Sequence, residues 1–203
     1  MSDQAHAIRQ AVPEDQGAVA QTVTAAFAAD PAWAFIVGDR YERLALHFAS
    51  ALFDVRVRSQ NVWVSDGLTA VAMWDAPVRP DRSTPSEHAR RTWARYRELA
   101  GEDAFARLTR YNEAVAAASP TERYWYLGVL ATHPDHRRKG LATAVLRPML
   151  ERADGSGADC CLETSTAENR RFYERRGFTQ ARDVRLAGGP MTWWLTRPPQ
   201  SAV

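Results

Sequence analysis

The chain has 203 residues, of which 45% are hydrophobic and 25% are charged, and its formal net charge is +2. This length suits one domain with a substantial core, and so mild a charge does not by itself favour nucleic-acid binding. The first ten residues are polar, and no apolar run reaches the roughly 18 residues of a membrane-spanning helix, so we expect a cytoplasmic protein without membrane partners. The two cysteines, Cys160 and Cys161, are adjacent, which favours two buried thiols in a reducing compartment over a disulfide.

The N-terminal part of the chain alternates between strand-like and helix-like patterns. Pro13 and the two acids after it suit the first turn of a helix, and Asp30-Pro31 is expected to break that helix. Asp66-Gly67 lies between two strand-like runs and predicts a hairpin turn. We therefore expect a strand at 7–12, a helix from Pro13, a second helix over about 39–57, and strands at 62–64 and 69–74.

Residues 76–122 differ in composition from the segments around them. A Pro-rich stretch covers 76–88, and two helical patterns at about 87–99 and 104–118 follow it, separated by Gly101. Because this block interrupts the series of strands, we interpret it as a helical insert, either a lid or an element that shapes a substrate site.

The C-terminal half predicts the strongest elements. Residues 124–131 are apolar almost throughout, which is typical of a central strand covered on both faces. A helix is expected after Gly140, with a kink or an early end at Pro148, because proline removes a backbone N–H. The remaining expected elements are a strand at 159–163, a helix at 168–176, and strands at 178–186 and 191–196. Together they predict a mixed α/β single domain over 1–197 and a flexible tail at 198–203.

Residues 133–143, HPDHRRKGLAT, carry a basic run into the expected helix start. The first N–H groups of a helix are unpaired and carry partial positive charge, so they bind phosphate well. Gly140 would let a ligand approach the backbone closely, since it has no Cβ. The spacing is not that of a P-loop, and a solvated turn also explains these residues taken alone.

Two stretches, LGVLATHPDHRRKGLATAVL at 127–146 and LETSTAENRRFYERRGF at 162–178, resemble the GNAT superfamily of N-acetyltransferases. The superfamily's order of strand, R-x-x-G-x-A-like turn, helix, strand and N-x-x-x-Y-x-x-x-G-F element is present at its usual spacing. Over most of the chain the resemblance is closest to the puromycin N-acetyltransferases, and it is weakest over about 78–120. Arg138 and Ala142 stand where the turn commonly has glycine.

This resemblance implies a GNAT fold, with a mixed, mostly antiparallel sheet of about six to seven strands, strands four and five splayed apart, and helices on both faces. It implies acetyl-CoA as the cosubstrate, with its pantetheine arm along the splayed strand and its pyrophosphate on the turn. The five scattered histidines and the adjacent cysteines have no metal-ligand spacing, so no metal is expected. A backbone N–H near Leu130 or Ala131 is expected to polarise the thioester carbonyl. The residues expected to bind acetyl-CoA are Leu130, Ala131, Thr132, Arg137, Arg138, Lys139, Gly140, Leu141, Ala142, Thr143 and Asn169.

Direct acetyl transfer to an amine requires a base and an acid, because the amine must lose a proton before it attacks and the leaving thiolate must gain one. Tyr173 in the C-terminal motif is the candidate acid, although a core aromatic residue beside Phe172 would also explain it. Glu163 at a strand end is the candidate base, directly or through a water, and a surface glutamate is the alternative. Asn169 could bind the pantetheine arm or only cap the short helix.

The chain contains seven tryptophans, most of them expected in the core. Trp93, Tyr96 and Trp125 are candidates for an aromatic-lined acceptor site, which would suit a flat amine such as an aminonucleoside. We therefore expect an enzyme that acetylates a small-molecule amine, with a role in antibiotic resistance, as a monomer or a homodimer. An acetyltransferase acting on a peptide or protein amine and a non-catalytic acetyl-CoA sensor are the alternatives, and nucleic-acid binding is not expected.

Overall fold

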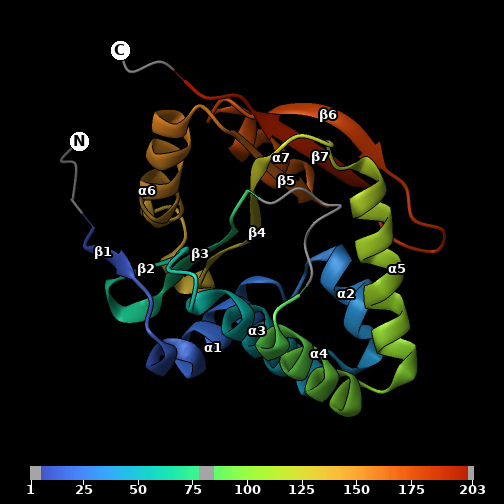
Figure 1. Cartoon of the computed structure of the whole chain (residues 1–203). Coiled ribbons are helices and arrows are strands. Elements are labelled where there is room, and N and C mark those ends of the chain that lie inside the picture. Colours follow the sequence, from blue (N-terminus) through green and yellow to red (C-terminus); the bar gives the residue numbers. More distant parts are fainter. Residues whose placement is uncertain (1–5, 78–84, 201–203) are drawn as a thin grey trace.

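The computed structural model describes residues 6–77 and 85–200, and a seven-stranded sheet crosses the middle of them (Figure 1). The strands are β1 (Ile8–Gln10), β2 (Val62–Ser65), β3 (Ala70–Asp75), β4 (Tyr124–Thr132), β5 (Asp159–Thr164), β6 (Thr179–Val184) and β7 (Thr192–Arg197). The helices are α1 (Gln16–Ala26), α2 (Pro31–Val37), α3 (Tyr41–Val57), α4 (Glu87–Ala100), α5 (Glu102–Ala118), α6 (Leu141–Ser156) and α7 (Ala167–Glu174). Among the described residues, no helix is long and apolar enough to cross a membrane.

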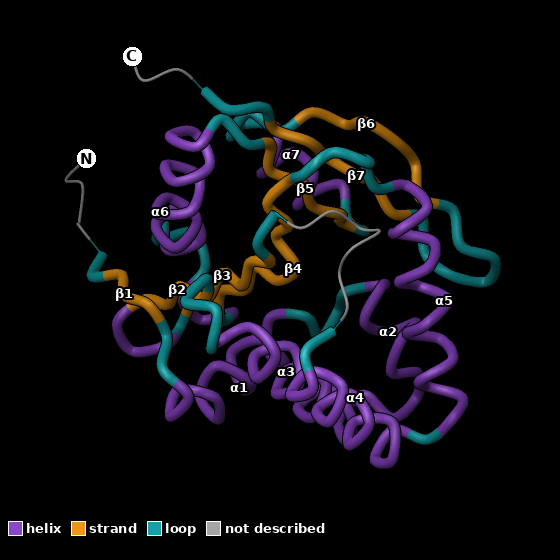
Figure 2. The backbone as a smooth tube through the Cα atoms, viewed as in Figure 1, coloured by secondary structure: helices purple, strands orange, loops and turns teal. Residues whose placement is uncertain are grey.

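The sheet has the order β1-β2-β3-β4-β5-β7-β6, and β4 is its central strand, as predicted. Neighbouring strands are antiparallel except for β4 and β5, which run parallel. Their pairing covers only Tyr124–Tyr126 and Asp159–Cys161, so the two strands part beyond Tyr126 (Figure 2). The expected mixed, mostly antiparallel sheet with strands four and five splayed apart is thereby confirmed.

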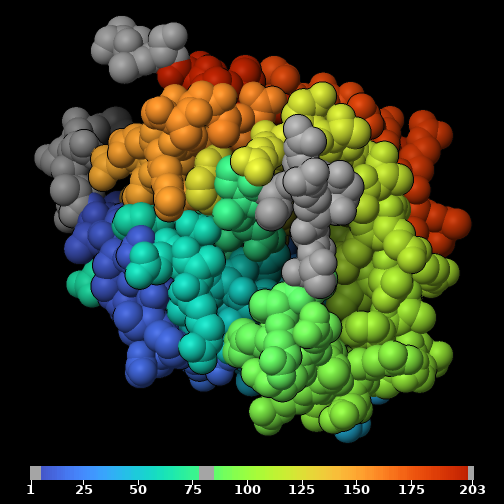
Figure 3. Space-filling model, viewed as in Figure 1, coloured from blue at the N-terminus to red at the C-terminus, as the bar shows by residue number. Residues whose placement is uncertain are grey.

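Helices cover both faces of the sheet and form two separate cores. Under α6 and α7, the core contains Val145, Met149 and Phe178. Under α1 to α5, the core contains Phe48 and Phe53 of α3. In Figure 3 the residues of α4 and α5, coloured green to yellow-green, form the lower and right sides of the visible surface. The helical insert therefore covers the same face of the sheet as the N-terminal helices, and α4 packs against α3 while α5 packs against α2.

A β-bulge in β4 changes which side chains face each side of the sheet. Leu127 and Val129 pair with consecutive residues of β3, so Gly128 is an extra residue. Leu127 packs in the core under α6, whereas Val129 packs in the core under α1 to α5. An extra residue reverses the alternation because side chains in a strand have a period of two. On the N-terminal side of the bulge, Tyr126 also packs in the core under α1 to α5.

The segment 31–37 is helical, which the sequence analysis did not predict. The helix α1 ends at Ala26, before Asp30-Pro31, and this pair begins α2. The Asp30 carboxylate accepts the backbone N–H groups of Ala32 and Trp33 at 2.9 and 3.0 Å, and Pro31 is the first helical residue. The pair that we interpreted only as a helix breaker is therefore also an N-terminal cap.

Three other local expectations concern Pro148, the Pro-rich stretch and the C-terminal tail. The helix α6 continues past Pro148 to Ser156, where Gly157 in the left-handed conformation caps it, so the early end is wrong. The middle of the Pro-rich stretch, residues 78–84, lies outside the described residues. The expected tail is described as far as Gln200, whose backbone N–H donates to Asp154 at 2.8 Å.

Candidate active site

A cavity of about 180 Å³ lies where β4 and β5 part, on the face covered by α1 to α5. We call it the central cavity. Its aromatic wall consists of Phe27, Trp33, Phe48, Trp93, Tyr111, Tyr126 and Tyr173. Its polar lining includes Asp30, Arg56, Asn112, Glu163, Ser165 and Asn169. The cavity therefore combines flat apolar surfaces with carboxylate, amide and hydroxyl groups.

Glu163 lies in β5 and lines the central cavity. The Tyr126 hydroxyl donates to its Oε2 at 2.5 Å, and the Tyr111 hydroxyl donates to its Oε1 at 3.4 Å. Burial raises the pKa of the Glu163 carboxyl to about 6, although these hydrogen bonds and the positive charge of Arg56 act in the opposite direction. A carboxyl with this pKa is mostly ionised at neutral pH and is a stronger base than an ordinary glutamate.

Tyr173 is a buried residue of α7 that lines the same cavity. Its ring makes edge contacts with Phe172 and Phe178, at 5.3 and 5.7 Å between ring centroids. Burial, together with the negative charge of Glu163, raises the pKa of the Tyr173 phenol above its ordinary value. The phenol is therefore protonated at neutral pH, and the core contacts of its ring fix where the hydroxyl lies.

Asn169 also lines the central cavity, near the start of α7. The capping residue of this helix is Thr166, whose hydroxyl accepts the backbone N–H of Asn169 at 3.2 Å. The Asn169 side chain is therefore not the cap of α7, and the capping alternative does not explain it.

Asp30 connects the two sides of the central cavity. One carboxylate oxygen caps α2, and the other accepts the hydroxyl hydrogen of Ser165 at 2.9 Å. Ser165 follows β5 directly, two residues after Glu163. This contact ties the N-terminus of α2, which carries Trp33 into the cavity wall, to the end of the strand that carries the candidate base.

The turn between β4 and α6 has the backbone geometry of an anion site. Arg138 and Gly140 both adopt left-handed conformations, with φ of 62° and 84°, and among the described residues no side chain caps the N-terminus of α6. Lys139 donates from Nζ to the Asp135 carbonyl at 3.2 Å, and Arg137 donates to the Ala26 carbonyl at 3.1 Å. Because these two basic side chains tie the turn to its surroundings, the backbone N–H groups at the start of α6 are the better phosphate ligands.

The edge of β4 that faces β5 is open beyond Tyr126, within the strands that the structure describes. Leu130 lies on this stretch and lines the central cavity, and Ala131 and Thr132 follow it. An extended chain with amide groups could pair with this edge in the way that a further strand would. The open edge leads from the cavity toward the turn, so a ligand with an extended amide-bearing arm and a phosphate group, such as acetyl-CoA, would fit along this stretch.

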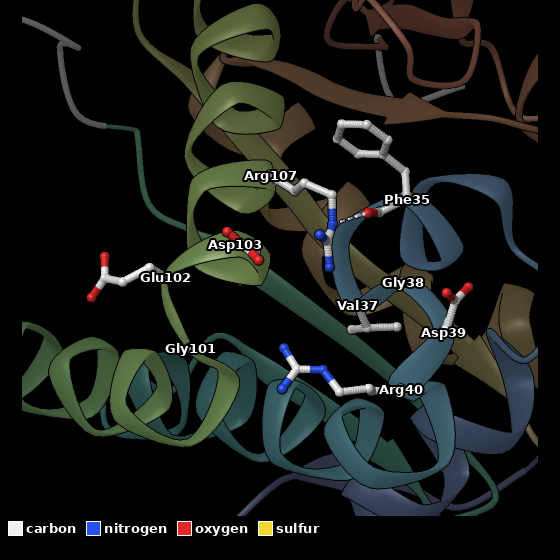
Figure 4. Close-up of a pocket in the computed structure, with 9 residues that line it drawn as sticks. All are labelled: Phe35, Val37, Gly38, Asp39, Arg40, Gly101, Glu102, Asp103 and Arg107. Atoms are coloured by element: carbon white, nitrogen blue, oxygen red, sulfur yellow. Dashed lines mark hydrogen bonds between the residues drawn. The ribbon is translucent and has the colours of Figure 1, made fainter.

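A larger hollow of about 630 Å³ lies elsewhere, between the end of α2 and the start of α5 (Figure 4). Arg107 enters it from α5 and donates from Nε to the carbonyls of Phe35 and Ile36, at 2.8 and 3.2 Å. Arg40, on the other side, donates to the carbonyl of Ala100. Both arginines thus bind the C-terminal ends of helices, and neither Glu163 nor Tyr173 lines this hollow. Size alone does not identify the reactive site, and we place it in the central cavity.

Comparison with protein families agrees with this geometry. The model of the acetyltransferase (GNAT) family matches residues 70–178, which is more than half of the chain and includes β4, the turn, α6, β5 and α7. The chain belongs to the GNAT acetyltransferase family. It is therefore a GNAT N-acetyltransferase, and the cosubstrate of that family is acetyl-CoA.

Several solved structures share the GNAT fold over nearly the whole chain. An acetyltransferase from Corynebacterium glutamicum, described as histone acetyltransferase HPA2 and related acetyltransferase, is 20% identical with a TM-score of 0.70, covering 98% of this chain and 99% of that one. A putative arylalkylamine N-acetyltransferase 7 from the yellow fever mosquito is 13% identical with a TM-score of 0.69, covering 96% and 88%. A polyamine N-acetyltransferase from Drosophila melanogaster is 12% identical with a TM-score of 0.66, covering 95% and 99%. At these identities the likeness concerns the fold.

Within this GNAT domain, the three aromatic residues expected at the acceptor site lie in different places. Trp93 of α4 lines the central cavity. Tyr96 is buried behind it, with its ring 5.9 Å from that of Trp93. Trp125 packs in the core under α6, beneath the guanidinium of Arg152, so the structure does not bring it to the cavity. Of the three residues, only Trp93 lines the cavity, and Tyr96 packs against its ring.

Sequence reasoning missed several residues that line the central cavity. Tyr126 belongs to an aromatic-rich strand start, YWY at 124–126, which indicated a core strand and nothing more specific. Tyr111 follows Leu108 and precedes Val115 on the buried face of α5, so its pattern indicated core packing. Arg56 carried a clearer signal, because it is a cation within the apolar face of α3, where a buried charge needs a partner.

Proposed function

We propose that this GNAT enzyme transfers the acetyl group of acetyl-CoA directly to a primary amine of a small molecule with a flat aromatic part, such as an aminonucleoside. The observation that supports this most is that Glu163 and Tyr173 line one aromatic-walled cavity, at the point where β4 and β5 part. A base, an acid and an apolar acceptor surface are thus present around a single space.

In the proposed mechanism, bound acetyl-CoA supplies a thioester whose carbonyl carbon the amine attacks. Glu163 accepts a proton from the ammonium form of the acceptor, directly or through a water, and so frees the nitrogen lone pair. Backbone N–H groups of β4 near Leu130 or Ala131 stabilise the negative charge that develops on the carbonyl oxygen. As the carbon–sulfur bond breaks, Tyr173 donates its phenol proton to the departing sulfur and regains a proton from the nitrogen of the new amide. The products are a neutral amide and coenzyme A, and Glu163 then releases its proton to solvent.

The acceptor would lie against the aromatic wall of the central cavity. Trp93 comes from α4, whereas Trp33 and Phe48 come from α2 and α3, so the insert and the N-terminal helices share the wall. Trp33 and Phe48 are in edge contact, with ring centroids 4.8 Å apart, and this contact fixes their orientation. A flat ring gains most from rigid aromatic surfaces of this kind, which supports an aminonucleoside over a polyamine. A role in resistance to an aminonucleoside antibiotic would follow from this specificity.

The test is an acetyl-transfer assay that measures release of free thiol and the mass of the product. The panel consists of puromycin, an arylalkylamine, a polyamine and a peptide with a free amino group. We expect turnover with puromycin, and replacement of Glu163 by Gln should lower kcat/KM by about a hundredfold or more. The matched control is Glu168→Gln, which removes an exposed carboxylate of α7 and should leave the rate unchanged.

Other outcomes would overturn parts of the proposal. Turnover of the peptide without turnover of the small amines would indicate a protein or peptide acetyltransferase. Binding of acetyl-CoA without acetylation of any amine would indicate a sensor. A Glu163→Gln enzyme with unchanged kcat/KM would remove Glu163 from the mechanism, whatever the acceptor.

A further inference from the structure

Each carboxylate oxygen of Glu163 accepts a hydrogen bond from a different tyrosine. Tyr126 of β4 donates to Oε2 at 2.5 Å, and Tyr111 of α5 donates to Oε1 at 3.4 Å. Burial and the charge of Glu163 raise the pKa of both phenols well above the ordinary value, so both remain hydrogen-bond donors throughout the physiological range. The orientation of the carboxylate is thus determined from two elements that are distant from β5 in the sequence.

The two donors are themselves held in place. The Tyr126 ring lies parallel to the ring of Trp194, with centroids 6.0 Å apart and an interplanar angle of 10°. Trp194 is the residue of β7 that pairs with Glu163 in the sheet, so Tyr126 and Glu163 share one support. Tyr111 is buried on α5, which packs against α2. Because neither ring is free to turn away, the geometry of the carboxylate is preorganised.

An ion pair between a buried arginine and a partly exposed aspartate lies beside this cluster. The Arg56 guanidinium donates to Asp75 of β3 at 2.7 Å and to the carbonyl of Leu52 at 3.1 Å. It lies flat against the bulge of β4, since a Cβ on Gly128 would come within 2.8 Å of one of its nitrogens. Its positive charge favours the ionised form of Glu163, and Asp75 offsets part of that charge.

Two further ionisable groups lie around the cavity. Tyr173 of α7 and Asp30 of α2 line the same cavity. The negative charges of Asp30 and Glu163 both act on Tyr173 and on Tyr111. Like charges disfavour a second ionised carboxylate nearby, so Asp30 does not help Glu163 to ionise. The phenols of Tyr126 and Tyr111 and the charge of Arg56 are therefore the groups that stabilise the Glu163 carboxylate.

We propose that Tyr126 and Tyr111 are positioning residues for the base, which orient the Glu163 carboxylate toward the acceptor and set the pH at which it becomes active. This inference rests on the proposed role of Glu163. It also assigns a further task to the helical insert, because α5 supplies Tyr111. The insert then completes the catalytic base in addition to forming part of the acceptor wall.

The first measurement is the pH profile of kcat/KM for Tyr126→Phe. Removal of a donor to a carboxylate destabilises its charged form, so the rising limb should move to higher pH by about one unit. The rate should fall at pH 7 and recover in large part at higher pH, where Glu163 is ionised in the variant as well. Tyr111→Phe should move the limb in the same direction by less, because its hydrogen bond is longer. The ionisation of the acceptor amine also shapes the pH profile, but it contributes equally to the profiles of the wild-type protein and all variants.

Tyr124→Phe is the matched control. Tyr124 lies two residues earlier on β4 and packs against the same tryptophan, with ring centroids 5.8 Å apart. Within the described residues its hydroxyl makes no hydrogen bond to Glu163. This variant should leave the rising limb of the kcat/KM pH profile at the same pH as in the wild-type protein. A loss of rate at every pH in Tyr126→Phe, with an unmoved limb, would show that Tyr126 is only structural and would overturn the proposal.

A second measurement requires no turnover. In protein labelled with 13C at glutamate carboxyls, the signal of Glu163 is identified by its absence from Glu163→Gln. This signal should titrate at higher pH in Tyr126→Phe than in the wild-type protein, and an unchanged titration would contradict the inference. If the titration shifts while Glu163→Gln retains full activity, the hydrogen bonds hold the carboxylate but the proposed function has failed. The two failures are thus distinguishable.

Discussion

Gly140 is the residue on which the turn between β4 and α6 depends most. Its φ of 84° is a conformation that side chains other than glycine rarely adopt, and a Cβ there would lie 3.6 Å from His6. Gly140→Val should strain the turn and lower the affinity for acetyl-CoA by at least about tenfold. Lys139→Ala should lower it by less than about fivefold, because the side chain is exposed and its charge is screened. Isothermal titration with acetyl-CoA measures both.

The control for this pair is Gly157→Val at the other end of α6. Gly157 is also left-handed, with a φ of 65°, and no atom of the part of the chain that the structure describes lies within 4 Å of its would-be Cβ. This variant carries similar backbone strain at a site away from the turn. It should therefore be less stable than the wild-type protein but bind acetyl-CoA with the same affinity. Equal affinities for Gly140→Val and Lys139→Ala would contradict the view that the backbone, and not the basic run, binds the pyrophosphate.

Tyr173 offers a test of the acid at the same scale. Tyr173→Phe removes only the hydroxyl and keeps the ring contacts with Phe172 and Phe178. If the phenol protonates the leaving sulfur, kcat should fall by about a hundredfold while the affinity for acetyl-CoA stays the same. Steady-state kinetics and titration separate these quantities. An unchanged kcat would mean that Tyr173 is a core aromatic residue and no more.

Among the elements, α2 depends most on one side chain. Asp30 caps this short helix and binds Ser165 across the central cavity. Asp30→Ala should destabilise the protein by about 1 kcal/mol, and it should raise the KM for the acceptor because α2 carries Trp33. Chemical denaturation and acceptor kinetics test the two effects. The control is Asp39→Ala, which removes an exposed carboxylate just beyond α2. A normal acceptor KM in Asp30→Ala would show that α2 does not shape the acceptor site.

Elements with strong local signals were predicted well, and the exceptions have physical causes. The apolar run of β4, the glycine at the start of α6 and the Gly101 break between α4 and α5 lie where the sequence placed them. The helix α2 was missed because Asp30-Pro31 was interpreted only as a helix breaker, whereas it caps the start of the next helix. The bulge at Gly128 was missed as well, since it depends on pairing with β3.

At the scale of the whole molecule, Glu163 couples stability to pH. Its folded-state pKa of about 6 lies above the ordinary value of 4.5 because of burial. The folded protein therefore holds a proton that the unfolded chain has lost between these values. The stability that Glu163 contributes through this proton is fully present below pH 4.5 and is lost as the pH rises through 6. Above that pH, the buried charge of Glu163 costs about 2 kcal/mol.

The neutral variant Glu163→Gln should accordingly be inactive yet more stable than the wild-type protein at pH 8. We expect its free energy of unfolding to increase by up to about 2 kcal/mol at pH 8, and by less at pH 5. Urea denaturation at the two pH values measures this difference. Glu168→Gln, which changes an exposed carboxylate, should show no such dependence. A Glu163→Gln protein that is less stable at pH 8 would contradict the assigned burial cost.

The sequence by itself determined the family, the order of strands around the turn, and the candidate pair Glu163 and Tyr173. These signals are local, because a glycine at a helix start or a tyrosine four residues after an asparagine is specified within one short segment. Only the tertiary structure decided which groups surround Glu163. Tyr126 and Tyr111 lie 37 and 52 positions away along the chain, and strand order, the β4 bulge and the packing of α5 bring them to the carboxylate. Such contacts across a sheet depend on the pairing and parity of strands, which no single segment encodes.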